Sequence, residues 1–275
     1  MNNFFQCGRF RLALDRPLVM GVLNVTPDSF SDGGQYLSLS GALKRIEQMC
    51  ADGVDIIDIG GESTRPGATA VPEEEELRRV LPVIEAAVSF NVPLSIDTFK
   101  PAVMKATLAA GVDMVNDIAG LEAPGAMEAL QETQAGICLM HKQGNSPSMQ
   151  LNPVYTDVVA EVSAYLAARA SAVLAIGIDK SRIVIDPGFG FGKNLAHNCE
   201  LFRAIGPMLC ALDLPMLVGV SRKRMLGEIT GREVQERMVP SVVAALLAAQ
   251  AGAQIVRVHD VRETVDALKV WHSLK

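Results

Sequence analysis

One pattern recurs along the chain and limits what it can fold into. A short apolar run, rich in Val, Ile and Leu, stops abruptly at a polar residue or a glycine, and a helical stretch follows. Continuous apolar runs of this kind are typical of parallel strands that are buried on both faces. The eight runs are residues 18–23, 54–59, 93–96, 112–115, 136–140, 182–185, 215–220 and 254–258.

Eight strand–helix units in a chain of 275 residues predict an α/β fold, the (β/α)8 TIM barrel. No Pro/Ser-rich linker separates the units, so we expect a single domain over residues 1–275. Residues 10–14 are expected to belong to a short N-terminal β-hairpin arm, and Ser40 to cap a helix over residues 41–49. A doubly wound open sheet is the alternative fold.

The composition agrees with such a fold and excludes some functions. Hydrophobic residues make up 49% of the chain and aromatic residues only 5%, which favours aliphatic sheet and helix layers. The formal net charge of −6 argues against a non-specific nucleic-acid surface. No apolar run is seen to reach the roughly 18 residues of a membrane span, and no signal peptide is evident. The five cysteines include no C-x-x-C pair, which indicates a reducing compartment, the cytoplasm.

Polar residues stand at the ends of the eight apolar runs. In a TIM barrel the carboxyl ends of all strands meet at one rim, where the active sites lie. A polar residue at one strand end is ordinary because the rim meets water, but this set carries charges of both signs. We therefore expect one site there, formed by Asn24, Gly60-Gly61, Asp97, Asn116, His141, Asp186, Ser221 and His259.

Three of these residues carry short, planar acceptor groups: Asp97, Asn116 and Asp186. Two carboxylates and an amide on a rigid rim suit a flat ligand with several N–H donors, such as an amino-pyrimidinone ring. The alternative is a pair of carboxylates for acid–base chemistry, or a site for a divalent metal ion.

A second group is cationic or titratable. With the backbone N–H groups of Gly60-Gly61 it suits a phosphate or a diphosphate. Arg257 lies within an apolar strand, so its charge must have a partner. Arg222 is expected to be a solvated or structural cation. The members of the group are Arg65, Lys223, Arg257 and His259.

The glycine-rich stretch Gly188–Lys193 does not fit a nucleotide-binding motif. Pro187 stands where the Walker motif needs its first glycine, and Asn194 follows the lysine where the motif needs Ser or Thr. We expect a tight turn that presents Phe189 or Phe191 to the rim, followed by a helix that Asn194 caps. The four histidines lack a zinc spacing.

Seven segments at the strand ends resemble those of dihydropteroate synthase, and the resemblance covers nearly the whole chain. No single segment is decisive, but seven in this order are very specific. Lys142 departs from the family, which more often has Met there, and this affects only the loop. The segments are Asn24–Gly34, Gly60–Gly67, Ser95–Thr98, Asn116–Ile118, Asp186–Lys193, Ser221–Lys223 and Arg257–Asp260.

The resemblance implies a TIM barrel and a transferase of folate biosynthesis. Its reaction would be a magnesium-assisted condensation of 6-hydroxymethyl-7,8-dihydropterin diphosphate with 4-aminobenzoate, giving 7,8-dihydropteroate and diphosphate. Together with the apolar residues 239–250, it also implies a homodimer.

The resemblance further assigns roles by position. Arg257 would contact both the pterin and the diphosphate, and Asn24 and His259 would serve the diphosphate and its Mg²⁺, with Asp32 as a second metal ligand. The pterin would be held by Asp97, Asn116, Asp186 and Lys223 and lined by Ile118, Met140 and Gly219. The 4-aminobenzoate would be framed by Thr64, Pro66, Phe191 and Ser221, with Arg65 close by. The catalytic residues would be Asp97, Lys223, Arg257, His259 and Arg65.

Three other functions remain as alternatives. A pterin-binding methyltransferase on the same barrel would share the Asp and Asn pocket but would not need Thr64–Pro66 or Ser221–Lys223. A catalytically silent paralogue would have lost residues such as Asn24, which is present. An unrelated aldolase would want an isolated lysine at a strand end, whereas Lys223 adjoins Arg222.

Overall fold

The computed structural model describes residues 3–25, 34–62, 71–144 and 153–274. Four candidate site residues lie outside these ranges: Asp32, Thr64, Arg65 and Pro66.

Eight parallel strands form one sheet that closes on itself, with the order β8-β7-β6-β5-β4-β3-β10-β9. An isolated parallel bridge between Ile185 and Met216 joins the two ends. The predicted TIM barrel is therefore confirmed, and the open doubly wound sheet is wrong. The strands are β3 (Leu18–Asn24), β4 (Ile56–Gly60), β5 (Leu94–Asp97), β6 (Met114–Asp117), β7 (Gly136–Met140), β8 (Ile183–Asp186), β9 (Leu217–Val218) and β10 (Ile255–Val258).

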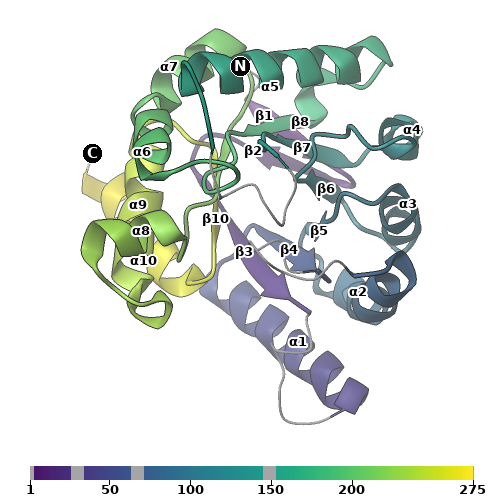
Figure 1. Ribbon diagram of the computed structural model, residues 1–275. Coiled ribbons are helices and arrows are strands. Elements are labelled where there is room, and N and C mark those ends of the chain that lie inside the picture. Colours follow the sequence, from purple (N-terminus) through teal and green to yellow (C-terminus); the bar gives the residue numbers. More distant parts are fainter. Residues whose placement is uncertain (1–2, 26–33, 63–70, 145–152, 275) are drawn as a thin grey trace.

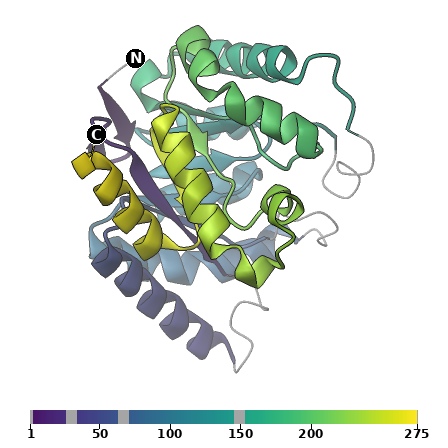
Figure 2. The ribbon, with the colours of Figure 1, turned by 90° about the vertical axis from the view of Figure 1, so that its left-hand side faces the viewer.

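Helices surround the strands (Figure 1), and in the turned view α1, α9 and α10 form the near layer (Figure 2). Short 3₁₀ helices lie at Val88–Phe90 (η2), Lys180–Arg182 (η3) and Val234–Glu236 (η4). The α-helices are α1 (Gly34–Asp52), α2 (Glu73–Ala87), α3 (Pro101–Ala109), α4 (Ala126–Gln131), α5 (Val158–Ala175), α6 (Leu195–Arg203), α7 (Ile205–Leu212), α8 (Arg224–Thr230), α9 (Met238–Gln250) and α10 (Val261–Leu274).

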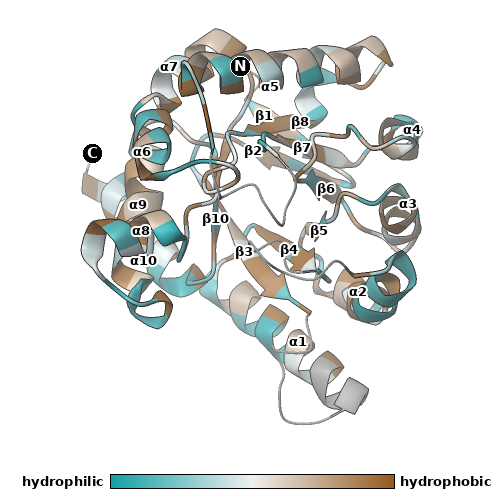
Figure 3. Cartoon of the chain, viewed as in Figure 1, coloured by the Kyte–Doolittle hydropathy of each residue, from teal (hydrophilic) through white to brown (hydrophobic). Residues whose placement is uncertain are grey.

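Alternation along the strands separates two apolar cores. Outward-facing residues such as Ile57 and Ile59 pack against the helices. Figure 3 shows largely apolar strands such as β3 and β4, and a helix with a polar outer face, α2. The lower barrel interior, toward the amino-terminal ends of the strands, is filled by Leu18, Met20, Ile56, Met114, Cys138, Val184, Leu217 and Ile255. Polar side chains can therefore face inward only above these layers, toward the carboxyl ends.

The expected N-terminal hairpin is present as β1 (Phe4–Cys7) and β2 (Phe10–Ala13), paired antiparallel. Phe5 and Cys7 are fully buried and belong to the same cluster as the lower barrel interior. The hairpin thus covers the amino-terminal end of the barrel, which leaves the carboxyl-terminal rim as the open end.

Two helix starts test the expected caps. Helix α1 begins at Gly34, so Ser40 lies inside it and the expectation of a cap there is wrong. The apolar spacing simply begins before residue 41, because Leu39 packs against the core and Ala42 and Ile46 are buried in it. Asn194 does cap α6, since its side chain accepts a hydrogen bond from His197 N at 2.9 Å.

Helix α5 is an exception to the expectation that no apolar segment reaches the length of a membrane span. Its 18 residues have a mean hydropathy of 1.5, which is long and apolar enough to cross a membrane by length and composition alone. Its buried residues lie on one face, and it packs beside β7, α6 and α7 as an outer barrel helix.

Candidate active site

Arg257 stands at the centre of the rim between two carboxylates. Its side chain projects inward from β10, and Nε donates to Asp58 Oδ2 at 2.6 Å while Nη2 donates to Asp97 Oδ2 at 2.7 Å. Burial lowers the pKa of Arg257, but the charges of Asp58 and Asp97 outweigh it and raise the pKa overall. The predicted need for a partner inside the apolar strand is therefore confirmed.

Asp58 organises the floor of this region. It is fully buried and also accepts hydrogen bonds from Ser95 Oγ at 2.6 Å and from Asn116 Nδ2 at 3.1 Å. The bond to Asn116 fixes the amide, with its nitrogen toward Asp58 and its oxygen turned away as an acceptor. Asp58 was missed as a site residue from the sequence. The available signal was its spacing from Gly60, which puts it on the inward face of β4.

Asp97 is held on one side only. Its Oδ2 pairs with Arg257, but Oδ1 is buried and has no hydrogen-bond partner within the described part of the chain. Burial raises the pKa of Asp97 to about 7, although Arg257 opposes the shift. An acceptor without a partner at the rim is expected where a ligand supplies the missing donor.

Lys223 approaches the rim from the other side. Its Nζ donates to Phe189 O at 2.6 Å and lies 4.6 Å from the centre of the Phe191 ring. Phe189 is fully buried, so Phe191 is the phenylalanine that the turn presents. Burial lowers the pKa of Lys223 to about 8, while the charge of Asp186 opposes that shift.

Asp186 and its neighbours form the wall between these groups. Asp186 is a register partner of Met140, and its Oδ1 accepts a hydrogen bond from Gly188 N at 2.7 Å. Burial raises the pKa of Asp186, while Lys223 lowers it. Ile118 is buried in the turn after β6, and a Cβ at Gly219 would lie 3.6 Å from the Cβ of Arg257.

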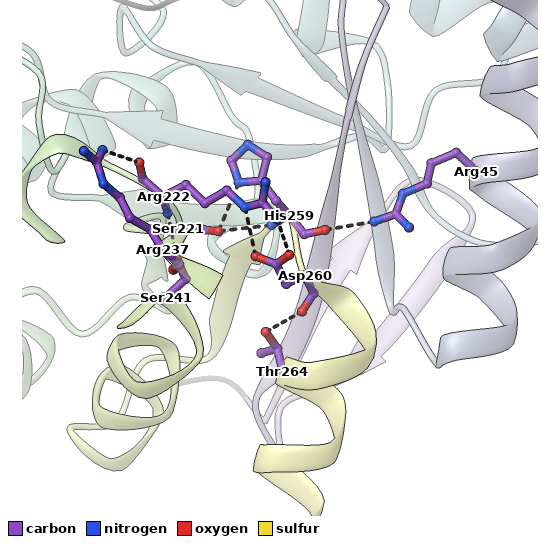
Figure 4. A network of polar contacts seen from close by, with 8 residues as sticks. All are labelled: Arg45, Ser221, Arg222, Arg237, Ser241, His259, Asp260 and Thr264. Carbon is purple, nitrogen blue, oxygen red and sulfur yellow. Dashed lines mark hydrogen bonds and ion pairs between the residues drawn. The ribbon is translucent and has the colours of Figure 1, made fainter. Parts of the chain in front are cut away.

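Ser221 and His259 contact each other directly (Figure 4). The Ser221 hydroxyl lies 3.0 Å from His259 Nδ1 and accepts from His259 N at 3.2 Å. Arg45 of α1 donates to His259 O at 2.8 Å. Arg222, expected to be solvated or structural, forms an ion pair with Asp260 in the same network. The ends of β9 and β10 are therefore linked through side chains as well as through the sheet.

Lys193 was missed from the sequence because a lysine in a glycine-rich loop gives no sign of burial. It is 2% exposed, and its Nζ contacts His141 Nδ1 at 2.9 Å and donates to Gly188 O at 2.9 Å. Burial lowers the pKa of Lys193 to about 7 and that of His141 to about 3. His141 is therefore a neutral acceptor that anchors the loop after β8, and does not act as a rim cation.

Asn24 ends β3 beside the acidic part of the rim. A Cβ at Gly60 would lie 3.6 Å from Asn24 Oδ1 and 3.7 Å from the Cβ of Asp97. Within the described residues, no group of three or more His, Cys, Asp or Glu side chains could hold a metal ion. A single amide oxygen suits only an ion that brings most of its ligands with it, as Mg²⁺ does with phosphate oxygens and water.

The structure thus gathers eight of the described candidates into three adjoining groups. One is the ion-paired centre of Arg257 with Asp97 and, through Asp58, Asn116. The second is Lys223 with Phe191 and Asp186, and the third is Ser221 with His259.

Comparisons with known proteins give the family to which the chain belongs. Residues 20–259 match the family described as "Pterin binding enzyme". A dihydropteroate synthase of Neisseria meningitidis serogroup B is 50% identical over 276 residues, covering 98% of this chain and 97% of the relative.

Two solved structures are similar over nearly their whole length. A Xanthomonas albilineans dihydropteroate synthase with 4-aminobenzoic acid has a TM-score of 0.93 and 51% identity, covering 100% of this chain and 98% of the other. A Burkholderia cenocepacia dihydropteroate synthase complexed with 7,8-dihydropteroate has a TM-score of 0.90 and 50% identity, covering 98% and 96%.

The chain belongs to the pterin-binding enzymes on the TIM barrel and, within that family, to the dihydropteroate synthases. It is accordingly a transferase. The expected resemblance is confirmed over nearly the full chain, which excludes the unrelated aldolase.

Proposed function

We propose that the protein condenses 6-hydroxymethyl-7,8-dihydropterin diphosphate with 4-aminobenzoate to give 7,8-dihydropteroate and diphosphate. The observation that carries this proposal is the buried Asp97 Oδ1, an acceptor without a partner among the described residues, which lies beside Asn116. The charges of Asp97 and Asp186 both act on Lys223. A pterin ring presents several N–H donors along its edges and would supply the missing hydrogen bonds. Solved relatives are complexes with 4-aminobenzoic acid and with 7,8-dihydropteroate.

The pterin would lie in the rigid part of the site. Asp97, Asn116 and Asp186 would accept from its ring nitrogens, and Lys223 would donate to its carbonyl oxygen. Ile118, Met140 and Gly219 would line the pocket; Ile118 and Met140 are buried, and Gly219 leaves room beside Arg257. The hydrogen bond from Arg257 Nε to Asp58 fixes the guanidinium and offsets part of its positive charge. The rest of the guanidinium can then face the ligand.

The diphosphate would lie toward Arg257 and His259. The Ser221–His259 contact orients the imidazole, and Arg65 would add a further positive charge. Thr64, Pro66, Phe191 and Ser221 would frame the 4-aminobenzoate, for which the Phe191 ring beside Lys223 offers an aromatic face next to a cation. Of these residues, Thr64, Arg65 and Pro66 lie outside the described part of the chain.

The chemistry would proceed without a covalent enzyme intermediate. The bond between the pterin methylene and the diphosphate oxygen breaks, the electron-rich dihydropterin stabilises the cationic methylene, and the amino nitrogen of 4-aminobenzoate attacks it. The electron pair of the broken bond leaves with the diphosphate, and the nitrogen then loses one proton to water. The negative charge of Asp97 would favour the developing cation, while Lys223, Arg257 and His259 would stabilise the departing anion.

Mg²⁺ would be held by Asn24 and Asp32 together with the diphosphate. The amide oxygen of Asn24 beside Gly60 fits such a partly substrate-held ion. When bound, Mg²⁺ would neutralise charge on the leaving group.

The test measures diphosphate release with both substrates and Mg²⁺, and with each omitted in turn. We expect release only in the complete mixture. Release without 4-aminobenzoate, or no release at all, would contradict the proposed reaction; binding without turnover would identify a silent paralogue.

A second test compares a substitution of the site residue Lys223 with a matched control. Lys223→Met should weaken binding of the pterin diphosphate at least tenfold, which corresponds to about 1.4 kcal/mol. Lys180→Met is the matched control, because Lys180 is a half-exposed lysine that pairs only with Asp213 in the described structure and precedes β8 at the opposite end of the barrel. Equal affinity in the two variants would contradict the assignment of Lys223.

Further expectations concern the whole chain. We infer that residues 1–275 act as one domain in the cytoplasm, which the five unpaired cysteines support. We also infer a homodimer through α9. Val239, Val243 and Leu247 follow one another at four-residue spacing on this helix and are 63%, 50% and 48% exposed, with Val270 of the adjacent α10 also exposed.

A further inference from the structure

The turn after β9 contains a backbone conformation that needs a reason. Arg222 has a φ of +58°, in the left-handed region that non-glycine residues seldom adopt. The conformation lies between two residues of the site, Ser221 and Lys223. The turn closes with Lys223 N donating to Val220 O at 3.1 Å, so that Ser221 contacts His259 while Lys223 reaches Phe189 O.

Two contacts hold the backbone of Arg222 in place. Its N–H donates to Ser241 Oγ at 2.9 Å, and its carbonyl oxygen accepts from Arg237 Nη1 at 3.2 Å. Gly227 makes room for the side chain of Arg237, because a Cβ at Gly227 would lie 2.3 Å from Arg237 Nη2. Both neighbours come from the α8–α9 region, so they fix the turn to the outer helices (Figure 4).

The side chain of Arg222 makes a different link, to the next strand end. Its Nε donates to Asp260 Oδ2 at 3.1 Å and its Nη2 to Asp260 Oδ1 at 2.5 Å. The Asp260 carboxylate is only 11% exposed and follows His259 directly. The backbone carbonyl oxygen of Asp260 accepts hydrogen bonds from the N–H and from the hydroxyl of Thr264 in α10. These bonds fix Asp260 to that helix.

The ion pair therefore runs beside the Ser221–His259 contact and joins the same two segments. Planar, two-pronged arginine–carboxylate pairs fix orientation as well as distance. We propose that Arg222 and Asp260 are positioning residues: their ion pair holds Ser221 against His259 and so fixes the part of the site that receives the diphosphate. This inference rests on the proposed function, because it concerns the diphosphate end of that substrate.

The left-handed backbone provides a sharp test. Arg222→Gly removes the ion pair but keeps the turn, because glycine adopts positive φ freely. Arg222→Ala removes the ion pair and also opposes the turn. Asp260→Asn removes the charge while keeping the size of the side chain. Calorimetry would measure the affinity of each variant for 6-hydroxymethyl-7,8-dihydropterin diphosphate and for the same pterin without diphosphate, and thermal unfolding would check folding.

We expect Arg222→Gly to fold like the wild type and to bind the pterin diphosphate at least tenfold more weakly, with the pterin alone bound within twofold of the wild type. Asp260→Asn should show the same split. The double variant should lose no more than either single one, because the two residues act as one unit. Arg222→Lys should recover part of the loss, since it keeps the charge without the fork.

Exposed charged residues of α10 supply matched controls. Arg262→Ala and Asp266→Asn change charge on the same helix and should leave both affinities unchanged. The proposal is overturned if Arg222→Gly binds the pterin diphosphate like the wild type, since the backbone alone would then matter. It is also overturned if both ligands weaken equally in step with the unfolding temperature. A wild type that does not bind the pterin diphosphate would instead refute the proposed function.

Discussion

Arg257 shows how far single residues could be interpreted from the sequence. A guanidinium within an apolar strand has to be paired, and that need was predictable from Arg257 alone. Its partner Asp58 comes from a strand almost 200 residues earlier, and the two meet because β3 pairs with both β4 and β10. Lys193 gave no signal at all, because its burial depends on the loop folding over His141. The sequence near a charged residue therefore shows that it needs a partner, whereas the identity of that partner depends on the fold.

The two shifted side chains of the site predict a bell-shaped pH dependence. Asp97 is ionised above its pKa of about 7, and Lys223 is protonated below its pKa of about 8. The catalytic efficiency kcat/KM for the pterin diphosphate should rise with pH through about 7 and fall through about 8. Lys223→Arg should move the falling limb to higher pH, because arginine stays charged. A falling limb that does not move would assign it to another group.

At the scale of elements, the strands were predictable and their bounds less so. The second run was expected at residues 54–59, but β4 begins at Ile56. Val54 N instead bonds to Met49 O at the end of α1. The seventh run was expected at residues 215–220, but β9 has only two residues, Leu217–Val218, and Met216 before it forms only an isolated bridge to Ile185. Apolar runs thus locate strands, while hydrogen bonds to neighbouring elements set their ends.

The N-terminal hairpin gives a prediction about stability. A Cβ at Gly136 would lie 2.5 Å from Phe5 Cζ and 3.2 Å from Gln6 O, so Gly136→Ala must displace the Phe5 ring. It should lower the free energy of unfolding by about 1–3 kcal/mol. Urea unfolding would show a lower midpoint with an unchanged slope. Adding Phe5→Leu should recover part of the loss; strictly additive losses would show that the ring is not the obstacle.

At the scale of the molecule, one closed barrel explains where chemistry can occur. The hairpin and apolar layers fill the amino-terminal half, so inward polar residues gather at the carboxyl-terminal rim. The fold and most of the site were predictable because the strand-end pattern repeats eight times. The links between strand ends, such as Arg222 with Asp260, were not predictable, because they depend on which loops become neighbours.

The exposed residues Val239, Val243 and Leu247 on α9 predict a homodimer. Val243→Asp should convert the dimer to a monomer, because it places a charge in the centre of an apolar contact. Sedimentation velocity at several concentrations would measure this. Val154→Asp is the control, since Val154 is 66% exposed but lies far from α9 in sequence, in the segment before α5. A wild type that sediments as a monomer would contradict the dimer.

The most direct test of the central claim is a single turnover with labelled 4-aminobenzoate, excess enzyme, pterin diphosphate and Mg²⁺. We expect one diphosphate released for each labelled 7,8-dihydropteroate formed, and no pterin or label attached to the protein. Diphosphate release without labelled product, or a pterin adduct on any side chain, would contradict the account.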